Sequence, residues 1–179
     1  MDGLRIRNQD ETFAGCIIQQ TYSALWHLEQ IIMKNKFKTV IELGTGHGAL
    51  CVFFSLHGQE TFTYQWENDN REIRVKELHE CLKIHFVLKD VLKECNVKEI
   101  MSVNRPLLLF CDNGNKEKEF ELYTPELKKG DYIIVHDREI EFFPNSEKNL
   151  DIEKRNNLIR INDQEMINDG TLLTVYRKD

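Results

Sequence analysis

The fold is decided by Val40-Ile-Glu-Leu-Gly-Thr-Gly-His-Gly-Ala-Leu50, an apolar run that passes directly into a glycine-rich loop. The pattern predicts a short buried strand, a loop and then a helix. Gly44, Gly46 and Gly48 lack side chains that would keep a ligand away from the backbone, and the amides at the start of the helix would face that ligand. The strand-loop-helix context therefore favours a ligand-binding loop over a purely structural turn.

Strand-like and helix-like segments alternate on both sides of this loop. The spacing of apolar residues predicts helices over 11–35, 49–56, 71–82, 91–101 and 116–127, and strands over 39–43, 61–66, 84–88, 106–111 and 131–136. Two last strands, 158–161 and 171–176, are expected to form a hairpin through the turn signal Asn168-Asp169-Gly170. The order predicts an α/β fold: a Rossmann-like, doubly wound, mostly parallel sheet with helices on both faces and a C-terminal antiparallel hairpin. We expect one domain over 38–179, with a helical appendage over 1–37 packed on it.

Composition narrows the class of protein. The 179 residues are 41% hydrophobic and 30% charged, as in ordinary globular domains, and no run approaches the roughly 20 apolar residues of a membrane span. The polar, acid-containing N-terminus resembles neither a signal nor a transit peptide, so we expect a cytoplasmic protein. A net charge of -6 argues against a dominant nucleic-acid or anionic-membrane footprint. The five cysteines form no C-x-x-C pair, which disfavours a disulfide scaffold or a zinc ribbon.

The glycine loop alone does not identify the cofactor, because Gly44-x-Gly46-x-x-Ala49 also satisfies a dinucleotide fingerprint. Glu42 lies in the strand two residues before the first glycine, where a carboxylate could accept from an ammonium group but would repel a pyrophosphate. Glu67 follows the second strand, in a position to accept from both hydroxyls of a ribose. That feature is shared with nicotinamide enzymes, so it supports a nucleoside without choosing among nucleosides.

The segment from Glu42 to Gly48 resembles the first motif of the class I S-adenosylmethionine-dependent methyltransferases. Glu67 matches the ribose acid of that family, and Asp90 matches the position that contacts the adenine amino group, although a helix N-cap explains Asp90 equally well. The terminal hairpin matches the reversed last strand of the family's fold. The resemblance implies that S-adenosylmethionine is bound by Glu42, Gly44, Thr45, Gly46, His47, Gly48, Glu67, Asp90 and Asp112.

Polar residues follow the fourth and fifth predicted strands. Asp112 closes the first of these, and His136 and Asp137 close the second. The carboxyl ends of parallel strands meet at one edge of the sheet, so we expect these three side chains to be neighbours. Two carboxylates favour magnesium or manganese, and an added imidazole also admits iron, zinc or nickel. A divalent metal site is therefore one interpretation, and an acid that closes over the cofactor beside a histidine that caps the sheet is the other.

The same pattern is similar to the catechol O-methyltransferase and cephalosporin-hydroxylase-like group of methyltransferases. That group has an acid after the fourth strand and an acid pair, or an acid and Asn, after the fifth. Here the pair is His136-Asp137, which departs from the pattern. Lys116 could reach Asp112, but its place within Lys-Glu-Lys-Glu favours the simpler interpretation that it belongs to a solvated helix face.

The sequence and this resemblance thus predict a methyltransferase with S-adenosylmethionine as cofactor and a small-molecule acceptor. One form of this prediction is an O-methyltransferase, in which Mg or Mn or a base assists at an acceptor hydroxyl. Asp112, His136 and Asp137 are the candidate catalytic residues. The loop Asp112-Asn-Gly-Asn lacks the motif of amino-methylating DNA enzymes, and no large recognition domain is expected. We expect a monomer or homodimer. The alternatives are a cofactor-binding protein without transfer activity and a nicotinamide-dependent oxidoreductase.

Overall fold

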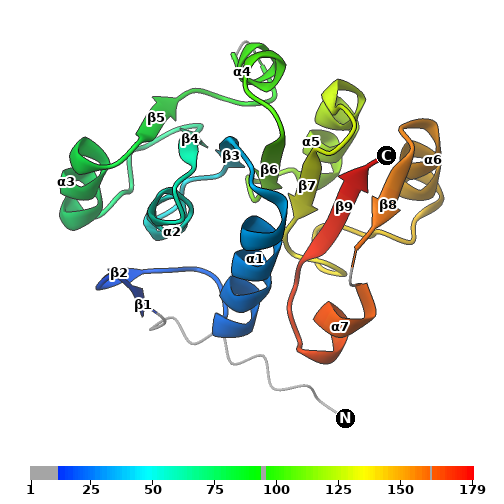
Figure 1. The fold of residues 1–179 in the computed structure, drawn as a ribbon, viewed down its shortest axis with the longest axis horizontal. Helices are drawn as coiled ribbons and strands as arrows, with labels where there is room; N and C mark the ends of the chain where they lie inside the picture. Colours follow the sequence, from blue (N-terminus) through cyan, green and yellow to red (C-terminus); the bar gives the residue numbers. More distant parts are fainter. Residues whose placement is uncertain (1–11, 94–95, 162) are drawn as a thin grey trace.

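A computed structural model describes residues 12–93, 96–161 and 163–179. Its centre is a seven-stranded sheet of order β5-β4-β3-β6-β7-β9-β8 (Figure 1). The strands are β3 (Thr39–Leu43), β4 (Glu60–Gln65), β5 (Ile84–Leu88), β6 (Leu107–Cys111), β7 (Tyr132–Val135), β8 (Leu158–Arg160) and β9 (Thr174–Lys178). Strands β5, β4, β3, β6 and β7 are parallel, whereas β9 runs antiparallel to both of its neighbours. The predicted doubly wound sheet with an antiparallel C-terminal pair is confirmed.

The two central strands, β3 and β6, are buried along their whole length because both of their faces are covered. From β3 the chain builds one half of the sheet through β4 and β5, and it then crosses back to β6 to build the other half. The strand order therefore reverses between β3 and β6. In open α/β sheets, the crevice at such a reversal is where ligands bind.

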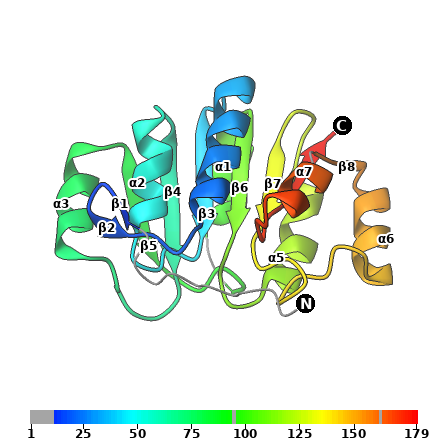
Figure 2. The ribbon, with the colours of Figure 1, turned by 90° about the horizontal axis from the view of Figure 1, so that it is seen from below.

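Helices cover both faces of the sheet (Figure 2). One face carries α1 (Tyr22–Asn35), α2 (Ala49–Leu56), α3 (Ile73–Cys81) and α7 (Asp163–Asn168); the other carries α4 (Val97–Val103), α5 (Lys116–Tyr123) with the 3₁₀ turn η1 (Thr124–Glu126), and α6 (Glu147–Arg155). Alternate residues of the central strands supply the two cores. Val40 and Leu108 belong to the first core, whereas Ile41 and Leu109 belong to the second. This division follows from the two-residue period of a strand.

The N-terminal part differs from the expected continuous helix over 11–35. Strands β1 (Thr12–Phe13) and β2 (Cys16–Ile17) form a hairpin instead, and α1 begins only at Tyr22. Gly15 has a φ of 77°, which a helix does not allow, and the Thr21 side chain caps α1 by accepting from the Ala24 amide. The spacing of the apolar residues is compatible with a helix, but the turn at Gly15 and the cap at Thr21 mean that the helix starts only after them.

Three other boundaries also differ. The helix expected over 91–101 begins at Val97, and α6 was not predicted, because its sequence is mostly charged. The turn signal at 168–170 ends α7 and does not close a tight hairpin, so β8 and β9 pair across an intervening helix. Within the described residues, no helix is both long and apolar enough to cross a membrane.

Candidate functional site

The glycine loop joins β3 to α2 in a backbone conformation that favours glycine. Gly44, Gly46 and Gly48 have φ values of 102°, 52° and 85°. A Cβ at Gly44 would lie 2.3 Å from the Asp112 carbonyl oxygen, and one at Gly48 would lie 2.7 Å from Cγ1 of Val75. These two glycines are therefore required by the packing of the chain itself, which brings β3 against the end of β6 and α2 against α3.

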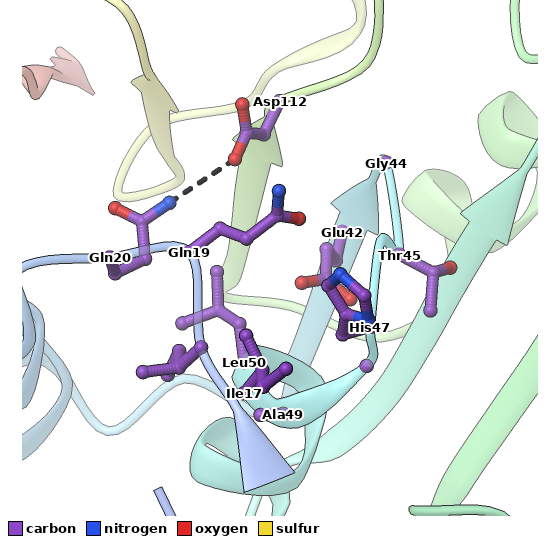
Figure 3. Close-up of a pocket in the computed structure, with 12 residues that line it drawn as sticks. Ile17, Gln19, Gln20, Glu42, Gly44, Thr45, His47, Ala49, Leu50 and Asp112 are labelled. Carbon is purple, nitrogen blue, oxygen red and sulfur yellow. Dashed lines mark hydrogen bonds between the residues drawn. The ribbon is translucent and has the colours of Figure 1, made fainter. Parts of the chain in front are cut away.

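Gly46 faces a different neighbour, the side chain of Gln19. A Cβ at Gly46 would lie 2.5 Å from Gln19 Oε1. Gln19 belongs to residues 17–20, which cross over the glycine loop and which we call the strap (Figure 3). The Ile17 amide donates to Glu72 Oε1 over 2.8 Å, and Gln20 Nε2 donates to Asp112 Oδ2 over 3.2 Å. The strap is thus held by a hydrogen bond at each end, and no pattern in the sequence indicated that it lies here.

A small pocket remains between the strap and the loop. It is lined by Ile17, Ile18, Gln19, Gln20, Glu42, Gly44, Thr45, His47, Gly48, Ala49, Leu50 and Asp112. Its cavity volume is about 20 Å³, which is room for about one water molecule. Sites for drug-sized ligands typically measure about 300–1,000 Å³. A ligand as large as a nucleoside therefore does not fit within this pocket as it stands.

Glu42 forms a buried acid in this pocket. Its side chain is 1% exposed, and one carboxylate oxygen accepts from the Thr63 hydroxyl, which lies 2.6 Å from the Thr45 hydroxyl. Burial raises the pKa of Glu42 to about 8, the Thr63 hydrogen bond opposes this rise, and the charge of Asp112 adds to it. A cation placed beside Glu42 would favour the ionised carboxylate.

The two residues predicted to hold the rest of a nucleoside lie outside this pocket. Glu67 is exposed, two residues beyond the end of β4. The last residue of β4, Gln65, reaches the loop instead, and its Oε1 accepts from the Gly46 amide over 3.3 Å. Asp90 accepts from the Leu92 amide over 2.9 Å, as in a local turn. The ribose and adenine roles stay predictions, and Gln65 is a neighbour of the loop that the sequence did not single out.

The three polar residues after β6 and β7 do meet. His136 Nδ1 lies 3.0 Å from Asp112 Oδ1 and 3.4 Å from Asp137 Oδ1. One ligand-type atom from each of the three residues lies within 4.8 Å of the others. Burial lowers the pKa of His136, but the carboxylates of Asp112 and Asp137 outweigh burial, so this pKa is raised. The predicted convergence is confirmed.

Lys116 is buried among these carboxylates, so its expected place on a solvated helix face was wrong. Its side chain is 6% exposed, and Nζ lies 2.7 Å from Glu141 Oε2, 2.9 Å from Asp137 Oδ2 and 3.5 Å from Asp112 Oδ1. Burial alone would lower the pKa of Lys116, but the three carboxylates raise it above its usual value. We call Asp112, Lys116, His136, Asp137 and Glu141 the edge cluster.

The loop after β7 brings two members of the edge cluster together. Asp137 and Glu139 both have a φ of 56°, which is uncommon for residues other than glycine. The Asp137 carbonyl accepts from the amides of Ile140, Glu141 and Phe142, which closes a compact turn. The guanidinium of the buried Arg138 pairs with the Asp163 carboxylate at the start of α7 and anchors this turn. Neither Glu141 nor Arg138 was predicted from the sequence as a site residue.

The donor set can be compared with what a divalent metal needs. Two carboxylates and an imidazole have suitable chemistry and spacing. However, the Lys116 ammonium already contacts both Asp112 and Asp137. A divalent metal would therefore have to bind beside this ammonium or displace it, and metal binding stays a prediction.

Comparisons with known proteins agree with this fold. The family model described as rhamnosyl O-methyltransferase/CmcI matches residues 7–160. No curated protein matches the sequence. An apo structure of CmcI has a TM-score of 0.73 at 15% identity, over 95% of this chain and 76% of that chain. A CmcI structure with Mg and SAM has a TM-score of 0.67 at 17% identity, over 96% and 77%.

The fold is also similar to a structure from a different kind of methyltransferase. An RNA methyltransferase from Salinibacter ruber, in complex with S-adenosyl-L-homocysteine, has a TM-score of 0.53 at 14% identity, over 90% of this chain and 92% of that chain. Similarity at this level of identity shows the fold alone. The acceptor must therefore be inferred from the site.

Proposed function

The chain belongs to the rhamnosyl O-methyltransferase/CmcI family, and from this premise we propose that it transfers a methyl group from S-adenosylmethionine to a hydroxyl oxygen of a small molecule. One observation carries the proposal. Asp112 lines the pocket over the glycine loop and also contacts His136, so the cofactor pocket and the polar edge cluster share a residue. A methyl donor and a polar acceptor would then meet at one place.

Each part of the pocket has a role in holding the cofactor. Glu42 would accept from the ammonium of the methionine moiety, and the amides of the loop, with Thr45 and His47 nearby, would face the carboxylate. The glycine loop and the end of β4 would hold the nucleoside. The CmcI structures with SAH and with Mg and SAM support this choice of cofactor.

The transfer itself is an in-line substitution. A lone pair of the acceptor oxygen attacks the methyl carbon, and the bond from carbon to sulfur breaks. The electron pair stays on sulfur, which yields S-adenosylhomocysteine. The hydroxyl proton passes to a base, for which we propose the Asp112–His136 pair; the contact of Nδ1 with the carboxylate supports this choice. The main contribution of the protein is the alignment of oxygen, carbon and sulfur.

The acceptor is proposed to be a small molecule. The pocket is small and the net charge is -6, so neither feature favours a polyanion as the acceptor. An uncharged or cationic molecule that presents a hydroxyl would meet less repulsion from the carboxylates of the edge cluster.

The test is a calorimetric titration of the purified protein with S-adenosylmethionine, S-adenosylhomocysteine and NAD, followed by a panel of small hydroxyl compounds assayed for S-adenosylhomocysteine release. We expect the first two ligands, and not NAD, to bind. Gly46→Val should abolish binding, since a branched side chain would lie in the cofactor's path. Binding without release for any acceptor would favour a cofactor-binding protein, and binding of NAD alone would overturn the proposal.

A further inference from the structure

Lys116 breaks two local rules of protein structure. It is the first residue of α5, where the helix dipole favours acids and disfavours a cation. It is also buried, although lysine is rarely buried without a paired charge. The neighbouring residues Glu117 and Glu119 follow the dipole rule. Such a conflict at one residue indicates that a tertiary interaction places it there.

The partners of Lys116 are held by a strained backbone. The turn that carries Asp137 and Glu141 contains two residues other than glycine in the left-handed region, Asp137 and Glu139. Conformations of this kind persist only where the surroundings enforce them, and they cluster at functional sites. Here the turn places the carboxylates of Asp137 and Glu141 at 2.9 and 2.7 Å from the ammonium. The helix start and the strained turn therefore serve the same contact.

We propose that Lys116 is the resident cation of the edge cluster, and that its ammonium takes the place of a divalent metal between Asp112 and Asp137. The inference rests on the proposed function. Lys116 Nζ contacts both carboxylates that a metal would have to bridge, so a divalent ion bound to them would be repelled by a neighbouring positive charge.

An ammonium in the place of a metal changes how the site can bind an acceptor. A metal ion can bind two neighbouring oxygens of an acceptor at once. The ammonium has three N–H donors, and its contacts with Asp112 and Asp137 leave only the donor that faces Glu141 for an acceptor. Glu141 is 51% exposed, so its carboxylate is the contact that an acceptor oxygen can replace. The ammonium then stabilises the developing negative charge on that oxygen, while the proton goes to the Asp112–His136 pair and Lys116 stays charged. The site therefore suits an acceptor that presents one oxygen.

The test measures Mn²⁺ binding from the decrease of the free-ion electron paramagnetic resonance signal, with S-adenosylhomocysteine present. The proteins are the wild type, Lys116→Met, Lys116→Arg and Lys118→Met, an exposed lysine of the same helix that serves as the matched control. We expect no binding up to about 1 mM Mn²⁺ in the wild type, Lys116→Arg and Lys118→Met. Lys116→Met should bind at least about tenfold more tightly, because the carboxylates lose their cation.

Wild-type protein that binds Mn²⁺ as tightly as Lys116→Met would overturn the proposal. If Lys116→Met does not fold, as judged by circular dichroism, the wild type decides: Mn²⁺ binding that Asp137→Asn abolishes would overturn it, and the absence of binding would support it. Calorimetry with S-adenosylhomocysteine on the same samples tests the proposed function separately. If the wild type does not bind S-adenosylhomocysteine, the proposed function is contradicted. The Mn²⁺ measurement still tests the role of Lys116, because it does not depend on bound S-adenosylhomocysteine.

Discussion

The Gln20 amide donates to the Asp112 carboxylate over 3.2 Å, which joins the strap over the glycine loop to the strand end that carries the edge cluster (Figure 3). The two residues are 92 positions apart in the sequence. Because the pocket beneath the strap holds about 20 Å³, we infer that this bond belongs to a closed state, which opens when a cofactor enters the pocket. The strength of the bond therefore bears on cofactor affinity.

We predict that Gln20→Ala tightens the binding of S-adenosylhomocysteine. The substitution removes a hydrogen bond to a charged group from the closed state only, which is worth about 1.5–3 kcal/mol when buried and less in this partly exposed position. The apparent dissociation constant should fall by up to about tenfold, as the open state becomes more populated. Calorimetry measures the change, and Gln164→Ala, at an exposed glutamine of helix α7, is the control. Weaker binding would instead mean that Gln20 contacts the cofactor.

Gly44→Ala should destabilise the fold more than Gly130→Ala. Both glycines have left-handed φ values, 102° and 88°, and an alanine in such a conformation costs roughly 1–2 kcal/mol. Nothing lies within 4 Å of a Cβ at Gly130, whereas a Cβ at Gly44 would lie 2.3 Å from the Asp112 backbone. Urea unfolding should show an additional loss of about 1–3 kcal/mol at Gly44. Equal losses would contradict the close approach of β3 and β6.

Cofactor binding should tighten as the pH rises from 6 toward 8. Burial raises the pKa of Glu42 to about 8, so the carboxyl is mostly protonated below that pH. If only the ionised form accepts from the cofactor's ammonium, affinity gains up to about tenfold per pH unit below the pKa. Calorimetry across this range checks the trend. Glu42→Gln should bind more weakly and with a much flatter pH dependence, and an unchanged slope in that variant would exclude Glu42.

The same pKa predicts the effect of Glu42 on stability. Between its usual value of 4.5 and about 8, the folded protein retains a proton that the unfolded chain has released. The contribution of Glu42 to the free energy of unfolding is therefore present at low pH and is lost as the pH rises through this window. Glu42→Gln, which does not titrate, should gain stability relative to wild type as the pH increases. A difference that does not vary with pH would contradict the raised pKa.

Gln65→Ala and Glu67→Ala separate the two candidates for the nucleoside contact. Gln65 contacts the Gly46 amide, whereas Glu67 is exposed beyond the strand. We expect Gln65→Ala to weaken binding of S-adenosylhomocysteine by about 0.5–1.5 kcal/mol, the worth of a neutral hydrogen bond, and Glu67→Ala to have the smaller effect. A loss of about 1.5–3 kcal/mol in Glu67→Ala would instead restore the role that the sequence predicted for this acid.

Much of the site could be predicted because it depends on local order. Each polar residue of the edge cluster that was predicted, Asp112, His136 and Asp137, follows a buried strand directly, and parallel strands bring such ends together. Lys116, Glu141 and the strap could not be found in this way. Lys116 lies in a charged run that is typical of a solvated helix, and its burial depends on a turn 21 to 25 residues further along the chain.

The sequence by itself determined the glycine loop and the class of fold, because these follow from the alternation of apolar strand and helix segments and from backbone conformations that favour glycine. Only the tertiary structure decided that Gln19 and Gln20 lie over the loop and that an ammonium lies between Asp112 and Asp137. The electrostatic energy of a charged side chain depends on the charges that surround it in space. Those charges come from segments that are distant in the sequence, so a local sequence pattern does not reveal them.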